Sequence, residues 1–174
     1  PKRDWSSDVC SSDLKATACI TTSGPGTTNL VTGIALAQKG RAPVLVIAGD
    51  VSRDHLHRDG AQALDLVGIF KPLCMNAVQV PKTERIVPML RDAFRAALTG
   101  KKGPVFVDIP RDLLDGQSVD ADILPPSAYR PTDLRVAGDA QAVARAARLL
   151  LDAKRPLLLA GGGVVDAEDR KSTR

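Results

Sequence analysis

Two short apolar runs place the strongest constraint on how this chain can fold. Residues 43–49, PVLVIAG, and residues 103–110, GPVFVDIP, lack the alternation of apolar and polar residues found in strands with one face in water. Such strands are buried on both faces of a parallel sheet. A helix is predicted between them from about Thr83, an acceptable N-cap, to Gly100. This alternation predicts a doubly wound parallel α/β domain.

The alternation of strands and helices ends near residue 113, and the stretch that follows divides the chain into two parts. Residues 113–138 are rich in proline and lack periodicity, which is typical of an extended connection. An amphipathic helix is predicted over about 142–150, followed by the apolar run RPLLLAGGGVV at 155–165, which is expected to form a buried strand. We therefore expect part of one α/β domain over residues 15–114, a linker over 115–138, and the start of a second, Rossmann-like α/β domain over 139–168.

Both ends of the chain are interpreted as non-native. The stretch DWSSDVCSSDL at residues 4–14 and the final DRKSTR can be encoded by DNA strings that are partly reverse complements of each other. Inverted complementary ends are what an insert between two sequencing adapters gives when it is translated through. We expect residues 1–14 and 169–174 to be adapter-derived tails, the alternative being flexible tails rich in Ser and Asp.

Composition excludes several classes of partner. Because 24 Lys and Arg residues are interspersed with 20 Asp and Glu residues, the formal net charge of +4 gives no basic stripe for nucleic acid. Outside the tails, Cys19 and Cys74 lie in apolar runs without CxxC spacing, so we expect reduced, buried thiols in a cytoplasmic protein. No apolar run approaches the roughly 18 residues of a membrane span. Neither nucleic acid nor a membrane is an expected partner.

The segment ITTSGPGTTN at residues 20–29 runs from a predicted strand into a predicted helix over Thr27–Lys39. Its glycine corner, Ser23–Gly26, would lie at the carboxyl edge of the sheet, where helix amides face ligands. A phosphate-binding P-loop needs Lys after the glycines, and a dinucleotide fingerprint needs Gly or Ala in place of Asn29. A nucleophile elbow needs a different Ser spacing. The local pattern leaves a structural turn and a ligand-binding loop both open.

Several longer stretches resemble a known family. In order along the chain they are TTSGPGTTNLVTGIALA, PVLVIAGDV, AQALDLVGIFKP and TGKKGPVFVDIPRD. Their order and spacing are similar to the pyrimidine-binding domain of thiamine-diphosphate-dependent enzymes, most closely the acetolactate synthase group. RPLLLAGGGV is similar to the start of that group's central domain. The resemblance implies an incomplete pyrimidine-binding domain, a linker and the opening of the central domain.

The resemblance also implies roles for individual residues. The glycine corner would lie beside the aminopyrimidine ring of thiamine diphosphate, with glycines allowing close backbone approach. Gln62 falls where the group has a glutamine that faces the thiazolium ring and the substrate, and it is the catalytic candidate. Gly161 and Gly162 would either approach FAD or ADP in the central domain or only turn the chain. The cofactor-binding candidates in the first domain are Ser23, Gly24, Pro25, Gly26 and Asn29.

The activity implied for the full-length protein is that of a carboligase and decarboxylase acting on a 2-oxo acid such as pyruvate. The glutamate that activates the cofactor, and the Gly-Asp-Gly to Asn motif that holds Mg²⁺ on its diphosphate, are expected outside this chain. The chain alone is therefore predicted to be inactive. Because family members build each active site across a subunit interface, a homodimer or tetramer is also implied.

Departures from the family pattern leave the substrate open. Ala61 and Ala63 stand where acetolactate synthases usually have Phe and Glu, and Met75 where Lys is common. Lys101 replaces an arginine that contacts FAD, and lysine lacks arginine's planar fork, which puts FAD binding in doubt. The alternatives are another superfamily member, of the oxalyl-CoA decarboxylase or 2-hydroxyacyl-CoA lyase type, and a non-catalytic nucleotide-binding relative.

No metal site is expected within the chain itself. His55 and His57, with Asp54 and Asp59 nearby, have a metal-like spacing, but they lie in a polar stretch without a third clear ligand. A solvated loop is the favoured interpretation.

Overall fold

The computed structural model describes residues 16–56, 58–116, 119–125, 137–159, 161, 163 and 164. The proposed tails, 1–14 and 169–174, lie outside the described residues, as does Gly162. The chain divides into two units, Pro1–Pro131 and Thr132–Arg174.

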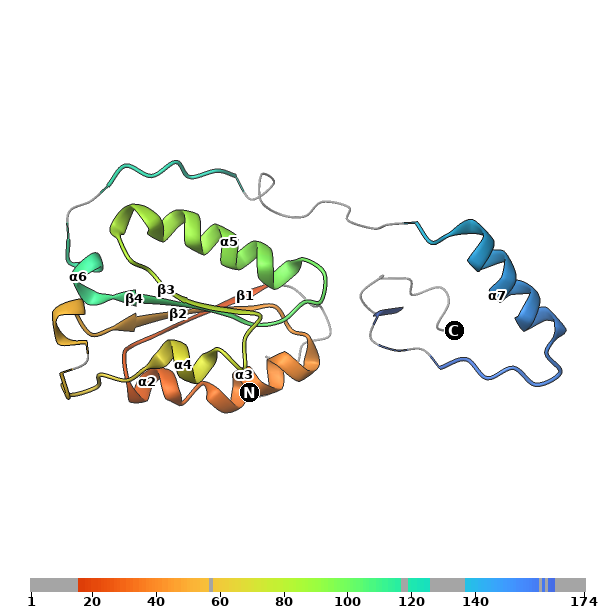
Figure 1. The fold of residues 1–174 in the computed structure, drawn as a ribbon, viewed down its shortest axis with the longest axis horizontal. Helices are drawn as coiled ribbons and strands as arrows, with labels where there is room; N and C mark the ends of the chain where they lie inside the picture. Colours follow the sequence, from red (N-terminus) through yellow and green to blue (C-terminus); the bar gives the residue numbers. More distant parts are fainter. Residues whose placement is uncertain are drawn as a thin grey trace, which may run out of the picture. The chain divides into compact units, whose positions relative to one another are not determined.

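The first unit is built on a parallel sheet of four strands in the order β1-β2-β4-β3 (Figure 1). In the register, Ala48 of β2 and Gln79 of β3 lie on either side of Asp108 in β4. This arrangement confirms the predicted parallel α/β fold. The strands are β1 (Thr17–Thr21), β2 (Val44–Asp50), β3 (Asn76–Gln79) and β4 (Val105–Pro110).

Helices cover both faces of the sheet. Helices α2 (Pro25–Thr28), α3 (Val31–Gly40) and α4 (Leu66–Phe70) lie on one face, and α5 (Ile86–Leu98) lies on the other (Figure 1). Short turns complete the unit: η1 (Arg53–His55), η2 (Thr83–Arg85) and α6 (Arg111–Leu114). The predicted helix at 27–39 is therefore two helices, and the helix predicted from Thr83 begins as a 3₁₀ turn.

Side-chain alternation along the strands produces two apolar cores. On the α3–α4 face, Phe70 of α4 stacks on Phe106 of β4 with ring centroids 4.4 Å apart. On the α5 face, Val105 and Val107 of β4 pack against the buried Ala93 of α5. Residues of β4 therefore alternate between the two cores, and all of them are buried, as predicted.

Strand β2 differs from its neighbour β4. Its residues alternate between buried and half-buried, because α5 lies chiefly over β4 and leaves Leu45 and Ile47 half-buried on that face. The prediction of burial on both faces is therefore wrong for β2. At the sheet edge, Ile20 of β1 is 78 % exposed. Strand β3 has no counterpart in the sequence prediction, since its four residues, NAVQ, form no apolar run.

The second unit carries helix α7 (Ala140–Asp152), which confirms the helix predicted near 142–150. Its N-cap is Asp139, whose carboxylate accepts a hydrogen bond from the Ala142 amide at 2.6 Å. The buried strand expected after it is not formed among the described residues. Leu157 and Leu159 are 93 % and 98 % exposed, because an apolar segment becomes a strand only when a neighbouring strand pairs with it.

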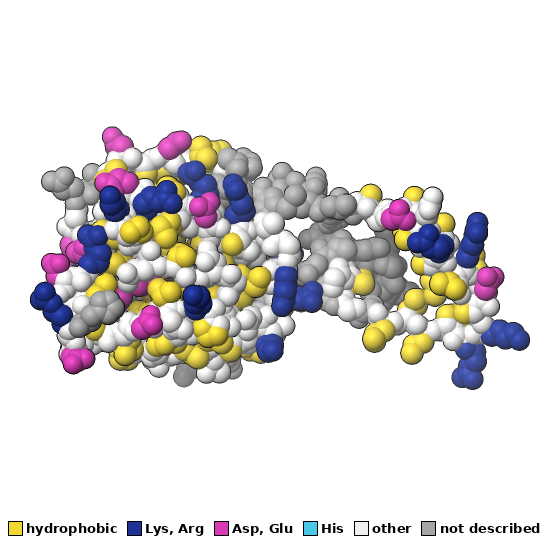
Figure 2. Space-filling model, in the orientation of Figure 1, with side chains coloured by type: hydrophobic (Ala, Val, Ile, Leu, Met, Phe, Trp, Pro, Cys, Tyr) yellow, Lys and Arg dark blue, Asp and Glu magenta, His cyan; other side chains and the backbone are white. Residues whose placement is uncertain are grey.

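Charged side chains of both signs lie on the surface (Figure 2). Figure 2 shows Lys and Arg side chains interspersed with Asp and Glu over the face drawn. Cys19 and Cys74 are unpaired and half-buried rather than fully buried, and burial raises the pKa of the Cys74 thiol to about 12. Within the described residues, no helix combines the length and the apolar character needed to cross a membrane.

Candidate functional site

The glycine corner, Ser23–Gly26, follows β1 and packs against Gln62. Gly24 has φ 57° and ψ −122°, a conformation that residues with a Cβ rarely adopt. A Cβ on Gly24 would lie 2.8 Å from the Cβ of Gln62 and 2.9 Å from its carbonyl oxygen. Glycine is therefore required at position 24 both by the backbone and by the closeness of Gln62.

Gln62 itself is held in an unusual conformation. Its φ of 71° lies in the left-handed region, which costs a residue with a side chain about 1–2 kcal/mol. The Ser23 hydroxyl donates a hydrogen bond to Gln62 Oε1 at 3.0 Å. This contact occupies the carbonyl end of the side-chain amide and leaves Nε2 able to donate elsewhere. Strained residues fixed by their surroundings gather at functional sites, which supports the choice of Gln62 as a site residue.

Thr27 holds the corner in place from its buried side, a role that sequence reasoning missed. Its side chain is fully buried, and its hydroxyl donates to the Thr22 carbonyl at 2.6 Å. Its backbone N–H donates to the Gly24 carbonyl at 3.0 Å. Pro25 of the corner and Asn29, the C-cap residue of α2, are exposed. The fixed interior of the corner thus lies close in sequence to two exposed side chains that a ligand can contact.

The structure therefore brings some of the predicted site residues together. Ser23, Gly24 and Gln62 are in direct contact, although they are far apart in the sequence. Gly161 lies in the second unit, where its carbonyl accepts a hydrogen bond from the Val164 amide at 3.1 Å. Contact of any of these residues with a cofactor stays a prediction.

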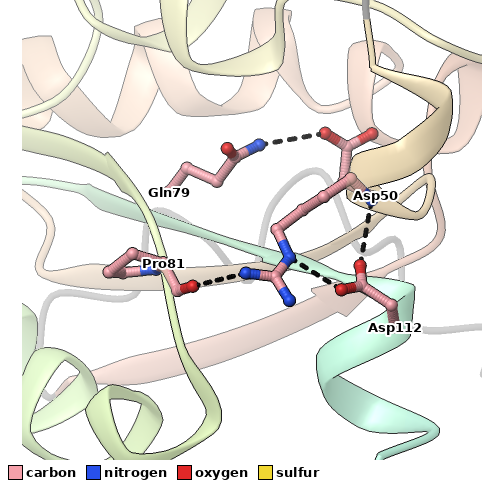
Figure 3. A network of polar contacts seen from close by, with 5 residues as sticks. Asp50, Gln79, Pro81 and Asp112 are labelled. Atoms are coloured by element: carbon pink, nitrogen blue, oxygen red, sulfur yellow. Dashed lines mark hydrogen bonds and ion pairs between the residues drawn. The ribbon is translucent and has the colours of Figure 1, made fainter.

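A second group of polar residues lies at the carboxyl edge of the same sheet, and sequence reasoning missed it. We call Asp50, Gln79 and Asp108 the acid cluster; they come from β2, β3 and β4. Gln79 Nε2 donates to Asp108 Oδ2 at 2.8 Å. The same nitrogen lies 3.4 Å from Asp50 Oδ2 (Figure 3). The signal that could have revealed the cluster is an acidic residue near the end of each of two neighbouring apolar strands.

Burial dominates the electrostatics of the acid cluster. Asp50 and Asp108 are 4 % and 1 % exposed. Burial raises the pKa of the Asp108 carboxyl to about 7; the hydrogen bond from Gln79 lowers it, and the charge of Asp50 and a hydrogen bond to that carboxyl raise it. Among the described residues, Asp108 Oδ1 is buried without a hydrogen-bond partner. At about pH 7, the Asp108 carboxyl is therefore only partly ionised.

The acid cluster borders a cavity of about 400 Å³. Leu56, Leu64, Leu66 and Val67 give this cavity apolar walls, while Asp50, Gln79 and Asp108 give it a polar side. A mostly apolar cavity with a few convergent polar groups is the usual form of a small-molecule site.

An ion pair fastens the chain next to the acid cluster. The Arg53 backbone N–H and Nε donate to the Asp112 carboxylate at 2.9 and 2.7 Å, and Arg53 Nη1 donates to the Pro81 carbonyl at 2.7 Å (Figure 3). The Arg53 N–H and guanidinium hold the pKa of the Asp112 carboxyl below its usual value. Arg53 thus links the turn after β2 to the segments that follow β3 and β4.

No group of three or more His, Cys, Asp or Glu residues in the described part of the chain could hold a metal ion. His55 lies in η1, and His57 lies outside the described residues.

Comparison with known proteins shows which family the chain resembles. Residues 11–69 match the model of the thiamine pyrophosphate enzyme N-terminal TPP binding domain, a range that includes the glycine corner and Gln62. The chain is similar to the thiamine pyrophosphate enzymes. It is 39 % identical over 157 residues to a probable acetolactate synthase large subunit of Methanocaldococcus jannaschii, covering 87 % of this chain and 26 % of the relative.

Further relatives carry similar names. The acetolactate synthase isozyme 3 large subunit of Escherichia coli K12 is 37 % identical over 152 residues, covering 85 % of this chain and 26 % of the relative. The acetolactate synthase of Arthrospira platensis is 38 % identical over 157 residues, covering 88 % and 27 %. The resemblance to the thiamine pyrophosphate enzymes and to acetolactate synthases is confirmed. The chain spans about a quarter of the length of these curated relatives.

Proposed function

We propose that the intact protein containing this chain is a thiamine-diphosphate-dependent carboligase and decarboxylase that acts on a 2-oxo acid such as pyruvate. The observation that carries this proposal is the contact between the glycine corner and the strained Gln62, within the range that matches the TPP-binding domain. The names of the relatives, acetolactate synthases, support the choice of substrate class.

The residues of the chain fit the cofactor. Pro25 and Asn29 are exposed and would hold the aminopyrimidine ring, while Gly24 keeps the backbone free of a Cβ. Ser23 would orient Gln62, whose Nε2 would then donate a hydrogen bond to the substrate. Bound thiamine diphosphate supplies the chemistry that releases carbon dioxide and forms the new carbon–carbon bond.

Other parts of the proposal concern groups and surfaces beyond the corner. Mg²⁺ would bind the diphosphate through residues outside this chain, and FAD or ADP would bind in the second unit. We also propose a homodimer or tetramer, because Pro25, Asn29 and Gln62 are exposed and need a second surface to enclose a cofactor. The unpaired thiols of Cys19 and Cys74 support a cytoplasmic location.

The test is turnover by the intact protein supplied with thiamine diphosphate, Mg²⁺ and pyruvate. We expect carbon dioxide release together with acetolactate formation, and a loss of about a hundredfold in kcat/KM for Gln62→Ala. Gln38→Ala is the matched control, since Gln38 lies on α3 and donates to the Pro72 carbonyl away from the corner. Its activity should stay close to that of the parent protein.

Other outcomes would replace this proposal. Turnover of oxalyl-CoA or a 2-hydroxyacyl-CoA, with none of pyruvate, would favour the CoA-thioester type of enzyme. Binding of thiamine diphosphate without turnover of any of these compounds would favour the non-catalytic relative.

A further inference from the structure

The loop that carries Gln62 is not buried in the core of the first unit. We call residues 51–64, which join β2 to α4, the Gln62 loop. Its described residues are exposed or half-buried, and Leu56 and Leu64 line the cavity of about 400 Å³. A segment with so few buried contacts depends on its fastened ends for its position. The contacts at the ends of the loop therefore help to decide where Gln62 lies.

Arg53 fastens the first end of the Gln62 loop. Its Nε and its backbone N–H both donate to the Asp112 carboxylate, at 2.7 and 2.9 Å, and its Nη1 donates to the Pro81 carbonyl at 2.7 Å (Figure 3). Asp112 follows β4 and Pro81 follows β3 in the chain. The start of the loop is therefore tied to the ends of the two strands that lie beyond β2 in the sheet.

Short turns connect Arg53 to the part of the loop that holds Gln62. They close through backbone hydrogen bonds of 3.2, 3.3 and 3.1 Å, in which the amides of Leu56, Arg58 and Ala63 donate to the carbonyls of Arg53, His55 and Gly60. The first of these turns closes on the carbonyl of Arg53 itself. A chain of tight turns has little freedom of its own, so the orientation of Arg53 affects the course of the loop as far as Gln62.

We propose that Arg53 is a positioning residue: by tying the start of the Gln62 loop to Asp112 and Pro81, it holds Gln62 against the glycine corner. The consequence for turnover rests on the proposed function, in which Gln62 donates a hydrogen bond to the substrate. The fastening of the loop does not depend on that function, because it rests on contacts within the chain.

The chemistry of Arg53 suits fastening of a loop more than general stability. Its side chain and that of Asp112 are 46 % and 31 % exposed, and a pair this exposed adds little to the free energy of unfolding. A guanidinium donates from Nε and Nη1 in two fixed directions, which a lysine ammonium cannot do. Asp65 holds the other end of the loop, since its Oδ1 accepts from the Gly68 amide as the N-cap of α4. Loss of Arg53 should therefore loosen the loop while the sheet stays folded.

Hydrogen exchange of the intact protein, followed by mass spectrometry without cofactor or substrate, tests the fastening. In Arg53→Ala, the amides of residues 54–64 should exchange about fivefold faster, while those of β4 and α5 exchange as in the parent protein. Asp112→Ala removes the acceptor of both the Arg53 backbone N–H and Nε, so the same amides should exchange faster there too. Arg111→Ala breaks a comparable exposed ion pair with Asp115, and as the matched control it should leave the loop unchanged.

Turnover separates positioning from a general effect on the fold. If Arg53 acts through Gln62, kcat with pyruvate should fall about tenfold in Arg53→Ala, because a misplaced donor stabilises the transition state less. In a Gln62→Ala background the same change should cost less than about twofold, since no donor is left to misplace. Arg53→Lys keeps the charge but not the two fixed donors, so it should resemble Arg53→Ala. Arg111→Ala should keep the parent kcat.

Three results would overturn the inference: unchanged exchange of the loop in both Arg53→Ala and Asp112→Ala, an equal increase of exchange throughout β4 and α5, or a loss of kcat in the Gln62→Ala background as large as in the parent protein. If the intact protein does not turn over pyruvate, the proposed function fails, and exchange of the loop amides still decides whether Arg53 fixes the Gln62 loop.

Discussion

The glycine corner and the acid cluster occupy the carboxyl edge of the same sheet, yet they are built in different ways. The corner is a continuous piece of backbone that closes on Gln62, and its special feature is backbone conformation at Gly24 and Gln62. The acid cluster takes one side chain from each of β2, β3 and β4, and its special feature is buried charge. The carboxyl edge of the sheet thus holds a strained backbone at the corner (conformational strain) and, near it, buried carboxyl groups in the acid cluster (electrostatic strain).

The same apolar core supports the strained corner and the acid cluster. The acid cluster lies on the face of the sheet where Phe70 stacks on Phe106, and Thr27 anchors the corner with a fully buried side chain. A well-packed core lets a domain keep unfavourable groups at its functional edge. Separate substitutions can therefore measure each kind of strain.

The largest expected effect is a pH-dependent change in the free energy of unfolding, and it comes from the acid cluster. Folding raises the pKa of Asp108 from 3.8 to about 7, so the folded state keeps a proton that the unfolded state releases. The contribution of Asp108 to the free energy of unfolding is therefore greatest below about pH 4. It falls by up to about 4 kcal/mol as the pH rises to about 7. In Asp108→Asn this slope should disappear, and the free energy of unfolding at about pH 8 should rise.

Urea unfolding of the chain at several pH values measures this slope. Asp115→Asn is the control, because the Asp115 side chain is 65 % exposed in its pair with Arg111. If Asp108→Asn keeps the same slope as the parent chain, the pH dependence comes from other carboxyl groups.

The next effect belongs to the corner. Gly24→Ala forces a Cβ to 2.8 Å from the Cβ of Gln62 at φ 57°, so we expect a loss of about 3 kcal/mol in the free energy of unfolding. Gly33→Ala is the matched control, since a Cβ there meets nothing within 4 Å inside helix α3. That control should gain about 0.5–1 kcal/mol. Equal stability of both variants in urea would show that the corner relaxes freely.

The two regions also differ in how far the sequence predicts them. The glycine corner is visible as Ser23–Gly26 because a tight turn imposes its residue types locally. The partner of the corner, Gln62, was found through family resemblance, since nothing local places it against Gly24. The acid cluster forms only when β3 pairs with β4, and β3 is too short and polar to be predicted.

Burial shows the same limit of sequence reasoning. The apolar runs at β2 and β4 look alike, but the structure buries every residue of β4 and leaves Leu45 of β2 half-buried. The run at residues 157–159 is equally apolar and is exposed in the described structure. An apolar run indicates that a segment is favoured in a buried position. Whether the segment is buried depends on the strands and helices that pack beside it.

A smaller effect tests whether the corner stores strain for function. Gln62→Gly removes the cost of a φ of 71°, so the free energy of unfolding should rise by about 1 kcal/mol, less the loss of the Ser23 hydrogen bond. Activity of the intact protein with pyruvate should fall at the same time. Unfolding in urea gives the first quantity, and turnover gives the second. A variant that is less stable and fully active would show that the conformation serves the fold alone.

The smallest effect connects the ion pair of Arg53 to the acid cluster. Arg53 and Asp112 are 46 % and 31 % exposed, so their pair should contribute less than about 1 kcal/mol, and the lowered pKa of Asp112 means that this contribution is lost as pH falls below 3.8. Arg53→Ala also frees the turn after β2 from Pro81, which should admit water to Asp108. Water would move the midpoint of the Asp108-dependent slope from about pH 7 toward its ordinary value of 3.8. Urea unfolding of Arg53→Ala across pH measures both changes. A midpoint that stays near 7 would mean that β2, β3 and β4 bury Asp108 without help from the ion pair.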